Sequence, residues 1–220
     1  ETIYVDDNLS KIPDIAVTGK AFYTYWFHNE IEILPSNIGT GSLILKLHGC
    51  NYRCRVEING THVLPLSSDG SSTTTDADAV GMFSSFEYDV TKFAAAGTAT
   101  RKTKTLLLSI LVEPPDWPGD ASSGGQGGDH LLAKNGPIAQ FAAGWDWAQA
   151  TPDRMTGLWD RVELQLRPTI DLKSPFVQLR FPKPFIPGEP VSSAPVEATV
   201  SVTARVPALQ AVQITSVRAD

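Results

Sequence analysis

Residues 53–66 read RCRVEINGTHVLPL, and this stretch decides the fold class. Its first half, residues 53–58, alternates apolar with charged side chains, which is the period-two pattern of a strand with one face in a core. Asn59 and Gly60 follow at once, and both residues tolerate the positive φ angles that a type I′ turn requires. The stretch therefore predicts a β-hairpin in which residues 62–66 return as the second strand.

The same alternation recurs along the chain, whereas no stretch of ten or more residues carries a helical stripe of apolar side chains. Tyr25 and Phe27 are expected to face inward from one such strand, and Val162 and Leu166 from another. The chain is therefore expected to be all-β. The further strands are expected at residues 43–47, 83–90 and 106–112, with one helical turn at 91–96.

The charge and the hydrophobicity of the chain exclude several classes of partner. The 220 residues carry 18 Lys and Arg against 24 Asp and Glu, a net charge of −6. This balance argues against nucleic acids and anionic membranes as partners, because both would repel an acidic protein. No run of about 18 uncharged apolar residues is present, so no membrane-spanning helix is expected.

The cysteines and the glycosylation sequons bear on the compartment. Cys50 and Cys54 fall within one apparent strand, where residues four positions apart are too distant to bridge, so we expect no disulfide between them. Asn8 and Asn59 begin Asn-X-Ser/Thr sequons and are candidate glycosylation sites. The sequons and the acidic character favour the secretory pathway, with a vacuole, lysosome or the extracellular space as the destination.

The motifs of a self-contained active site are missing from the sequence. None of the four histidines pairs with another at zinc-ligand spacing, and there is no nucleophile elbow, Walker loop or dinucleotide fingerprint. We therefore expect neither a metal nor a cofactor, and we interpret the histidines as surface or hydrogen-bonded core residues.

The most informative chemistry lies in two neighbouring stretches, GWDW at 144–147 and PDRMTGLWD at 152–160. A tryptophan ring offers an apolar surface to the C–H face of a sugar, and a neighbouring carboxylate accepts hydrogen bonds from its hydroxyls. The residue types alone leave two interpretations open. Either these residues form a sugar site, or the tryptophans are packing residues and Asp153 forms an ion pair with Arg154.

Six motifs follow one another between Tyr4 and Pro168: FYTYWFHNEIEI (22–33), LHGCNYRCRVEINGTHV (47–63), GMFSSFEYDVT (81–91), EPPDWPG (113–119), GGQGGDHLLAKN (124–135) and GWDWAQATPDRMTGLWDRVEL (144–164). Together they resemble the N-terminal sugar-binding domain of glycoside hydrolase family 2, and in particular that of its endo-β-mannosidases and exo-β-glucosaminidases. A single motif would be weak, but six in the same order are specific. The chain departs from many of these relatives at Met155, where they carry asparagine.

The resemblance implies two domains. Residues 1–168 would form a jelly-roll-like β-sandwich of the galactose-binding type that lacks its N-terminal part, and residues 169–220 would begin an immunoglobulin-like β-sandwich. In the family a (β/α)8 barrel holds both catalytic glutamates, so no catalytic residue is expected in this chain. The chain is expected to be the non-catalytic N-terminal portion of a retaining β-glycosidase of the β-mannosidase type.

The resemblance also assigns roles to residues. Trp145 and Asp146 would contact the terminal sugar of a β-linked oligosaccharide substrate, while Trp147, Asp153 and Arg154 would support them by shaping the loop. The expected partners are the barrel and the rest of the immunoglobulin-like domain, as a separate processed chain or as continuous polypeptide. The alternative is a β-sandwich that binds glycans or stabilises an extracellular assembly without catalytic activity. A further alternative keeps the enzyme and changes the sugar.

Overall fold

Strands dominate the part of the chain that the structure describes, which confirms the all-β fold class. The chain divides into two compact units, Glu1–Leu166 and Arg167–Asp220. The computed structural model describes residues 11–67, 78–95, 103–115, 138, 139, 142, 144, 150–181, 187 and 197–205.

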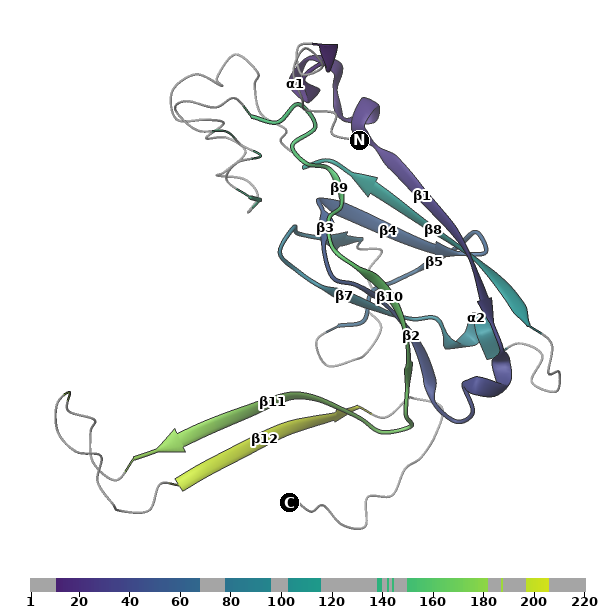
Figure 1. The fold of residues 1–220 in the computed structure, drawn as a ribbon, viewed down its shortest axis with the longest axis vertical. Coiled ribbons are helices and arrows are strands. Elements are labelled where there is room, and N and C mark those ends of the chain that lie inside the picture. Colours follow the sequence, from purple (N-terminus) through teal and green to yellow (C-terminus); the bar gives the residue numbers. More distant parts are fainter. Residues whose placement is uncertain are drawn as a thin grey trace. The chain divides into compact units, whose positions relative to one another are not determined.

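The first unit consists of strands joined by turns and by helices of one or two turns (Figure 1). Among the described residues, no helix has the length and hydropathy needed to cross a membrane. The helices, of which η2 and η3 are 3-10 helices, are α1 (Ile15–Thr18), η2 (Lys20–Tyr23), η3 (Pro35–Asn37) and α2 (Thr91–Ala95). The strands are β1 (Tyr25–Ile33), β2 (Ser42–Leu47), β3 (Cys50–Asn51), β4 (Arg53–Ile58), β5 (Thr61–Val63), β6 (Ala79–Val80), β7 (Phe86–Asp89), β8 (Lys104–Glu113), β9 (Gly157–Leu158) and β10 (Val162–Arg167).

These strands form two main sheets. One sheet has the order β1-β8-β4-β5, with β6 also paired to β4, and the other has the order β10-β2-β7. The long strands β1 and β8 run antiparallel beside each other from the pair Tyr25–Val112 to the pair Ile33–Lys104 (Figure 1). A separate short pair joins β3 to β9, with Cys50 opposite Leu158.

Side chains from both sheets meet in one hydrophobic cluster, so the unit is a β-sandwich. Leu45 of β2, Val56 of β4 and Ile110 of β8 are all at most 2% exposed. Burying one such side chain contributes about 1.5–3 kcal/mol relative to leaving it in water. The inward face expected for residues 53–58 is confirmed, since its alternate apolar side chains belong to this cluster.

The predicted hairpin is also confirmed. Asn59 and Gly60 have φ angles of 50° and 73°, and β4 and β5 pair on either side of them. The Asn59 Oδ1 atom accepts a hydrogen bond from the backbone N–H of Leu107 at 2.8 Å, which ties the turn to β8. The returning strand is shorter than expected, because β5 ends at Val63.

Two strands bury less than their sequence pattern predicted. Tyr25 and Phe27 of β1 are 37% and 39% exposed, and Val162 and Leu166 of β10 are 37% and 55% exposed, so these four side chains are less buried than expected. Their faces are nevertheless the inward ones, since Ile31 and Leu164 on the same faces pack against the core. The physical reason is position in the sheet. Both β1 and β10 end the strand order of their sheets, so their side chains lie at the margin of the core rather than within it.

Cys50 and Cys54 are joined by a disulfide, so the expectation that they could not bridge is wrong. The strand that holds them is interrupted, because β3 ends at Asn51 and β4 begins at Arg53, with a bend at Tyr52. In a continuous strand the two Cα atoms would lie about 13 Å apart. At the bend they lie 6.7 Å apart, which is within the usual range for a disulfide.

The second unit contains an antiparallel ribbon of β11 (Asp171–Arg180) and β12 (Glu197–Arg205). Large apolar side chains on this ribbon lie open to water, with Phe176 63% exposed and Val200 60% exposed. Two strands alone, which are what the described part of this unit contains, cannot bury a core. The assignment of this unit to an immunoglobulin-like sandwich stays a prediction.

Candidate functional site

Only part of the sequence-predicted site lies among the described residues. Trp145, Asp146 and Trp147 lie outside them, as does the sequon residue Asn8. Asp153 and Arg154 are described, in the turn that leads into β9. The described part of the site is therefore this turn together with the residues that hold it.

Arg154 is the centre of this part of the site. Its side chain is fully buried, and its guanidinium forms a two-pronged ion pair with Asp14, with Nη1–Oδ2 at 2.8 Å and Nη2–Oδ1 at 3.1 Å. A buried guanidinium needs such a carboxylate, because the desolvation of an unpaired charge costs several kcal/mol. The partner in this ion pair is thus a residue near the start of the chain, rather than the neighbouring Asp153.

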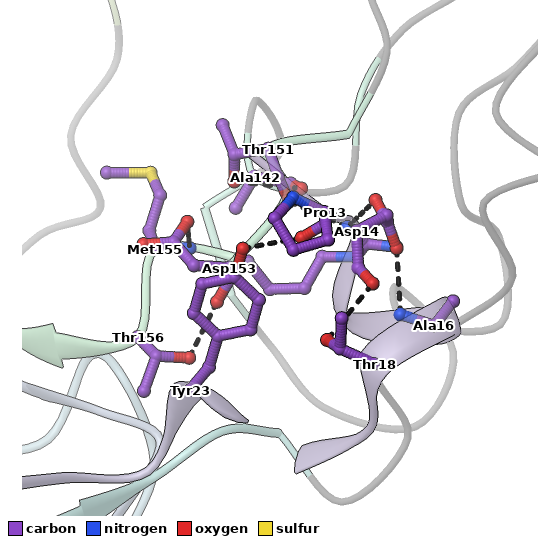
Figure 2. Close-up of polar contacts among 11 residues, drawn as sticks. Pro13, Asp14, Ala16, Thr18, Tyr23, Ala142, Thr151, Asp153, Met155 and Thr156 are labelled. Carbon is purple, nitrogen blue, oxygen red and sulfur yellow. Dashed lines mark hydrogen bonds and ion pairs between the residues drawn. The ribbon is translucent and has the colours of Figure 1, made fainter. Parts of the chain in front are cut away.

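Asp153 instead closes the turn. Its Oδ1 atom accepts a hydrogen bond from the Met155 backbone N–H at 2.8 Å, and its carbonyl accepts from the Thr156 hydroxyl at 2.6 Å. The interpretation in which Asp153 pairs with Arg154 is therefore wrong for the carboxylate of Asp153. Figure 2 shows these contacts beside those of Pro13, Asp14, Tyr23 and Thr151.

The turn has an uncommon backbone conformation. Arg154 and Met155 have φ angles of 51° and 58°, which non-glycine residues adopt at a cost. Asn51 supports both residues, since its Nδ2 group donates to the carbonyl of Arg154 at 2.8 Å and to that of Met155 at 2.9 Å. Asn51 is fully buried and lies between Cys50 and Cys54, which are joined by the disulfide. The disulfide-linked loop therefore supports the turn through the two hydrogen bonds of Asn51.

The segment before β1 packs against the same turn. The Ile15 backbone N–H donates to the Pro152 carbonyl at 2.9 Å, and the Tyr23 hydroxyl donates to the Pro13 carbonyl at 2.5 Å. Burial of the Tyr23 phenol, followed by the nearby carboxylate of Asp153, raises its pKa above the ordinary value, so it stays a hydrogen-bond donor at neutral pH. The turn is thus held from two sides.

The turn also anchors one end of the stretch that carries the predicted sugar contacts. The Thr151 backbone N–H donates to the Ala142 carbonyl at 3.1 Å, so the two ends of this stretch lie next to each other. The Thr151 carbonyl accepts from the Arg154 backbone N–H at 2.9 Å and from its Nη1 atom at 2.6 Å. Arg154 therefore links Asp14 to the point where the stretch ends.

Comparison with known proteins supplies the context for this geometry. No family model matches the chain. A mannosylglycoprotein endo-β-mannosidase from Lilium longiflorum is 33% identical over 159 residues, which make up 71% of this chain and 14% of that protein. Among solved structures, a β-D-mannosidase from Dictyoglomus thermophilum shares the fold with a TM-score of 0.51 and 16% identity, over 80% of this chain and 20% of that one.

The chain belongs to glycoside hydrolase family 2. The identity to the lily enzyme, the order of the six sequence motifs and the shared β-sandwich agree on this, with the chain as an N-terminal domain of the family. The chain spans about one seventh of the length of the lily enzyme and one fifth of that of the bacterial one.

Within this family 2 domain, Trp159 has a packing role. Its indole ring lies against the backbone of Gly49, where a Cβ atom would approach the ring to 2.5 Å. Its Nε1 group donates to the Met82 carbonyl at 2.9 Å, and Phe83 contacts it edge to face. One ring face and the N–H group are thus occupied by the domain itself, which favours the packing interpretation for this tryptophan.

Sequence reasoning missed two residues of the candidate site, Asp14 and Asn51. Asp14 lies outside the six motifs, and Asn51 lies within the second motif without having been assigned a role, because each acts on the turn across a long stretch of chain. A weak signal for Asp14 exists, since aspartate before Ile15 is a typical N-cap, and its Oδ1 atom does accept from the Ala16 N–H at 2.8 Å. Nothing in the local sequence indicates that Asn51 supports Arg154.

Proposed function

We propose that this chain is the non-catalytic N-terminal portion of a retaining β-glycosidase of the β-mannosidase type, and that Trp145 and Asp146 contact the terminal sugar of its substrate. The observation that carries the proposal is the anchoring of Thr151. A fully buried arginine holds this residue beside Ala142, and in the sequence these two residues flank Trp145 and Asp146. Rigid support of this kind is what a sugar-binding group on a loop requires.

The acidic residues of the domain support a non-catalytic role. Retaining hydrolysis needs two carboxylates about 5–5.5 Å apart, one as nucleophile and one as acid and base. The acidic groups of the described site have other tasks, since Asp14 pairs with Arg154 and Asp153 caps the turn. Among the described residues, no cluster of three or more His, Cys, Asp or Glu side chains could hold a metal ion.

The partner of the domain in this proposal is the rest of the same enzyme, a (β/α)8 barrel with the remaining immunoglobulin-like sandwich, acting on a β-linked oligosaccharide. The much greater length of the lily and bacterial relatives supports it. The exposed apolar side chains of the second unit, such as Phe176 and Val200, are also of the kind that a neighbouring layer would cover.

We also propose that the enzyme passes through the secretory pathway and is glycosylated at Asn59. The disulfide between Cys50 and Cys54 supports this route, because disulfides persist in oxidising compartments. Asn59 supports it as well, since it lies on an exposed turn. Treatment with an N-glycosidase should reduce the mass of the native enzyme, and the Asn59→Gln variant should lose the part of this shift that comes from Asn59.

The test of the main proposal uses the complete enzyme and an aryl β-mannoside. Asp146→Asn should lower kcat/KM by about tenfold or more, since a charge-assisted hydrogen bond to substrate contributes about 1.5–3 kcal/mol. The isolated 220-residue chain should not hydrolyse the substrate at all. Full activity of the Asp146→Asn enzyme, or hydrolysis by the isolated chain, would overturn the proposal.

A further inference from the structure

We propose that Asp14 is a positioning residue for the sugar site, acting through Arg154 on Thr151. The inference rests on the proposed function, because it takes Trp145 and Asp146 as the residues that contact substrate. It goes beyond that function by assigning a role to a residue near the start of the chain that no sequence motif singles out. The steps from Asp14 through Arg154 to Thr151 and Ala142 run through described atoms.

The first step is the dependence of the Arg154 guanidinium on Asp14. The side chain is fully buried, and two of its nitrogens face the two oxygens of one carboxylate at 2.8 and 3.1 Å. This parallel arrangement fixes the plane of the guanidinium as well as its position. Without the negative charge, the buried cation would lose two charge-assisted hydrogen bonds that fix this orientation.

The second step is the connection to Thr151. The same Nη1 atom that donates to Asp14 Oδ2 also donates to the Thr151 carbonyl at 2.6 Å. A shift of the guanidinium therefore changes the hydrogen bond to Thr151 directly. Thr151 in turn donates to Ala142, so both ends of the stretch with the predicted sugar contacts respond to the position of one nitrogen atom.

The chemistry of position 14 allows a selective substitution. Asp14 also caps helix α1 through its Oδ1 atom. Asparagine is as good an N-cap as aspartate and has nearly the same shape, so Asp14→Asn preserves the cap while it removes the charge. A suitable control is Asp171→Asn, because Asp171 also pairs with an arginine, at 3.1 Å, and is 21% exposed against 19% for Asp14.

The experiment is a double-mutant cycle between Asp14→Asn and Asp146→Asn in the complete enzyme, with kcat and KM measured on an aryl β-mannoside. Asp14→Asn should lower kcat/KM by about tenfold in the native background, since small misplacements of binding groups are costly. In the Asp146→Asn background the same substitution should change kcat/KM by less than about twofold, because the group that it positions is already altered. Asp171→Asn should leave kcat/KM unchanged.

The outcomes separate this inference from the proposed function. If Asp146→Asn has no effect, the proposed function fails. If Asp146→Asn lowers activity while Asp14→Asn has no effect, or has an additive one, the proposed function stands and the positioning role of Asp14 is wrong. Additive effects would indicate that Asp14 supports only the general stability of the domain.

A second pair of variants covers the case in which Asp14→Asn does not fold. Asp14→Glu keeps the negative charge but displaces it by one methylene group. Arg154→Lys keeps the positive charge but lacks the planar guanidinium that binds Asp14 and the Thr151 carbonyl at the same time. Both enzymes should fold, lose kcat/KM, and show the same non-additivity with Asp146→Asn. Native kcat/KM in both variants would overturn the inference.

Discussion

The carboxylate of Asp14 and the guanidinium of Arg154 form a two-pronged ion pair across 140 positions of the chain, with nitrogen–oxygen distances of 2.8 and 3.1 Å. The arginine is fully buried, whereas the aspartate side chain is 19% exposed. The pair joins the segment before β1 to the turn before β9, and it therefore supports both at once.

Loss of the Asp14 charge should destabilise the protein. Asp14→Asn removes the negative charge that faces a fully buried guanidinium, and the free energy of unfolding should fall by on the order of 3 kcal/mol. Asp171→Asn removes an ion pair with Arg167, whose side chain is 11% exposed and lies four residues away, and the smaller loss should stay within about 1 kcal/mol. Urea denaturation followed by tryptophan fluorescence measures both, and equal losses would contradict the special role of the buried pair.

Asparagine at position 155 should stabilise the turn. Met155 has a φ angle of 58°, a region in which asparagine is enriched because its side chain bonds locally. Met155→Asn should raise the free energy of unfolding by up to about 1 kcal/mol, whereas the β-branched Met155→Val should lower it. The same urea titration distinguishes the two, and a stabilising valine would show that the backbone at this position is unstrained.

A side chain at position 49 should displace Trp159. The Cβ atom of alanine would lie 2.5 Å from the indole ring, so Gly49→Ala should cost about 1–3 kcal/mol of stability. If the clash is the cause, Trp159→Leu should remove most of this cost when the two substitutions are combined. Independent, additive losses in thermal unfolding would refute the assigned contact.

Two tyrosines should respond oppositely to loss of the hydroxyl. The Tyr88 hydroxyl is buried without a hydrogen-bond partner, and burial raises its pKa. Tyr88→Phe should therefore leave stability unchanged or raise it by up to about 1 kcal/mol. Tyr23 donates to the Pro13 carbonyl, so Tyr23→Phe should cost about 1 kcal/mol. Equal destabilisation of both variants in urea would contradict this contrast.

The stability of the sandwich should depend on pH through Glu163. Hydrogen bonds from His48 and Gln165, together with the charge of Arg161, hold the pKa of this carboxyl below its ordinary value of 4.5. The stabilisation is therefore complete above about pH 4.5 and is lost as the pH falls through the lower pKa of the folded state. The difference in Tm between the native protein and Glu163→Gln should shrink over this acidic range.

The control for the pH experiment is Glu30→Gln, which alters an exposed carboxylate on β1. Subtracting its Tm difference from that of Glu163→Gln corrects for the loss of one carboxylate from the surface of the domain. A pH-independent difference for Glu163→Gln would show that the hydrogen bonds do not favour the charged carboxylate.

Local features of the fold could be predicted from the sequence, because their cause is local. The hairpin at Asn59 and Gly60 and the helical turn at the start of α2 follow from neighbouring residues. The buried face of β4 follows from its alternation. The exposure of Tyr25 could not be predicted, since alternation does not tell whether a strand is central or at the margin of a sheet.

The candidate site was predictable in its residue types but not in its connections. The sequence drew attention to the turn residues Asp153 and Arg154, whose role as supports of the sugar contacts stays a prediction, but the ion pair with Asp14 leaves no periodic pattern in the sequence. The disulfide was missed because the bend at Tyr52 interrupts the strand while the alternation of buried side chains continues. Interactions between distant residues are what the pattern of one sequence does not contain.

The span of the pair between residues 14 and 154 also constrains synthesis. The ribosome delivers the aspartate early, and the arginine follows only after 139 further residues, including all of β1 to β8, have emerged. Until Arg154 emerges, Asp14 lacks the guanidinium with which it pairs in the folded domain. The ion pair can therefore form only after translation has passed Arg154, which lies just before β9. Contacts between residues so far apart in the sequence are slow to form.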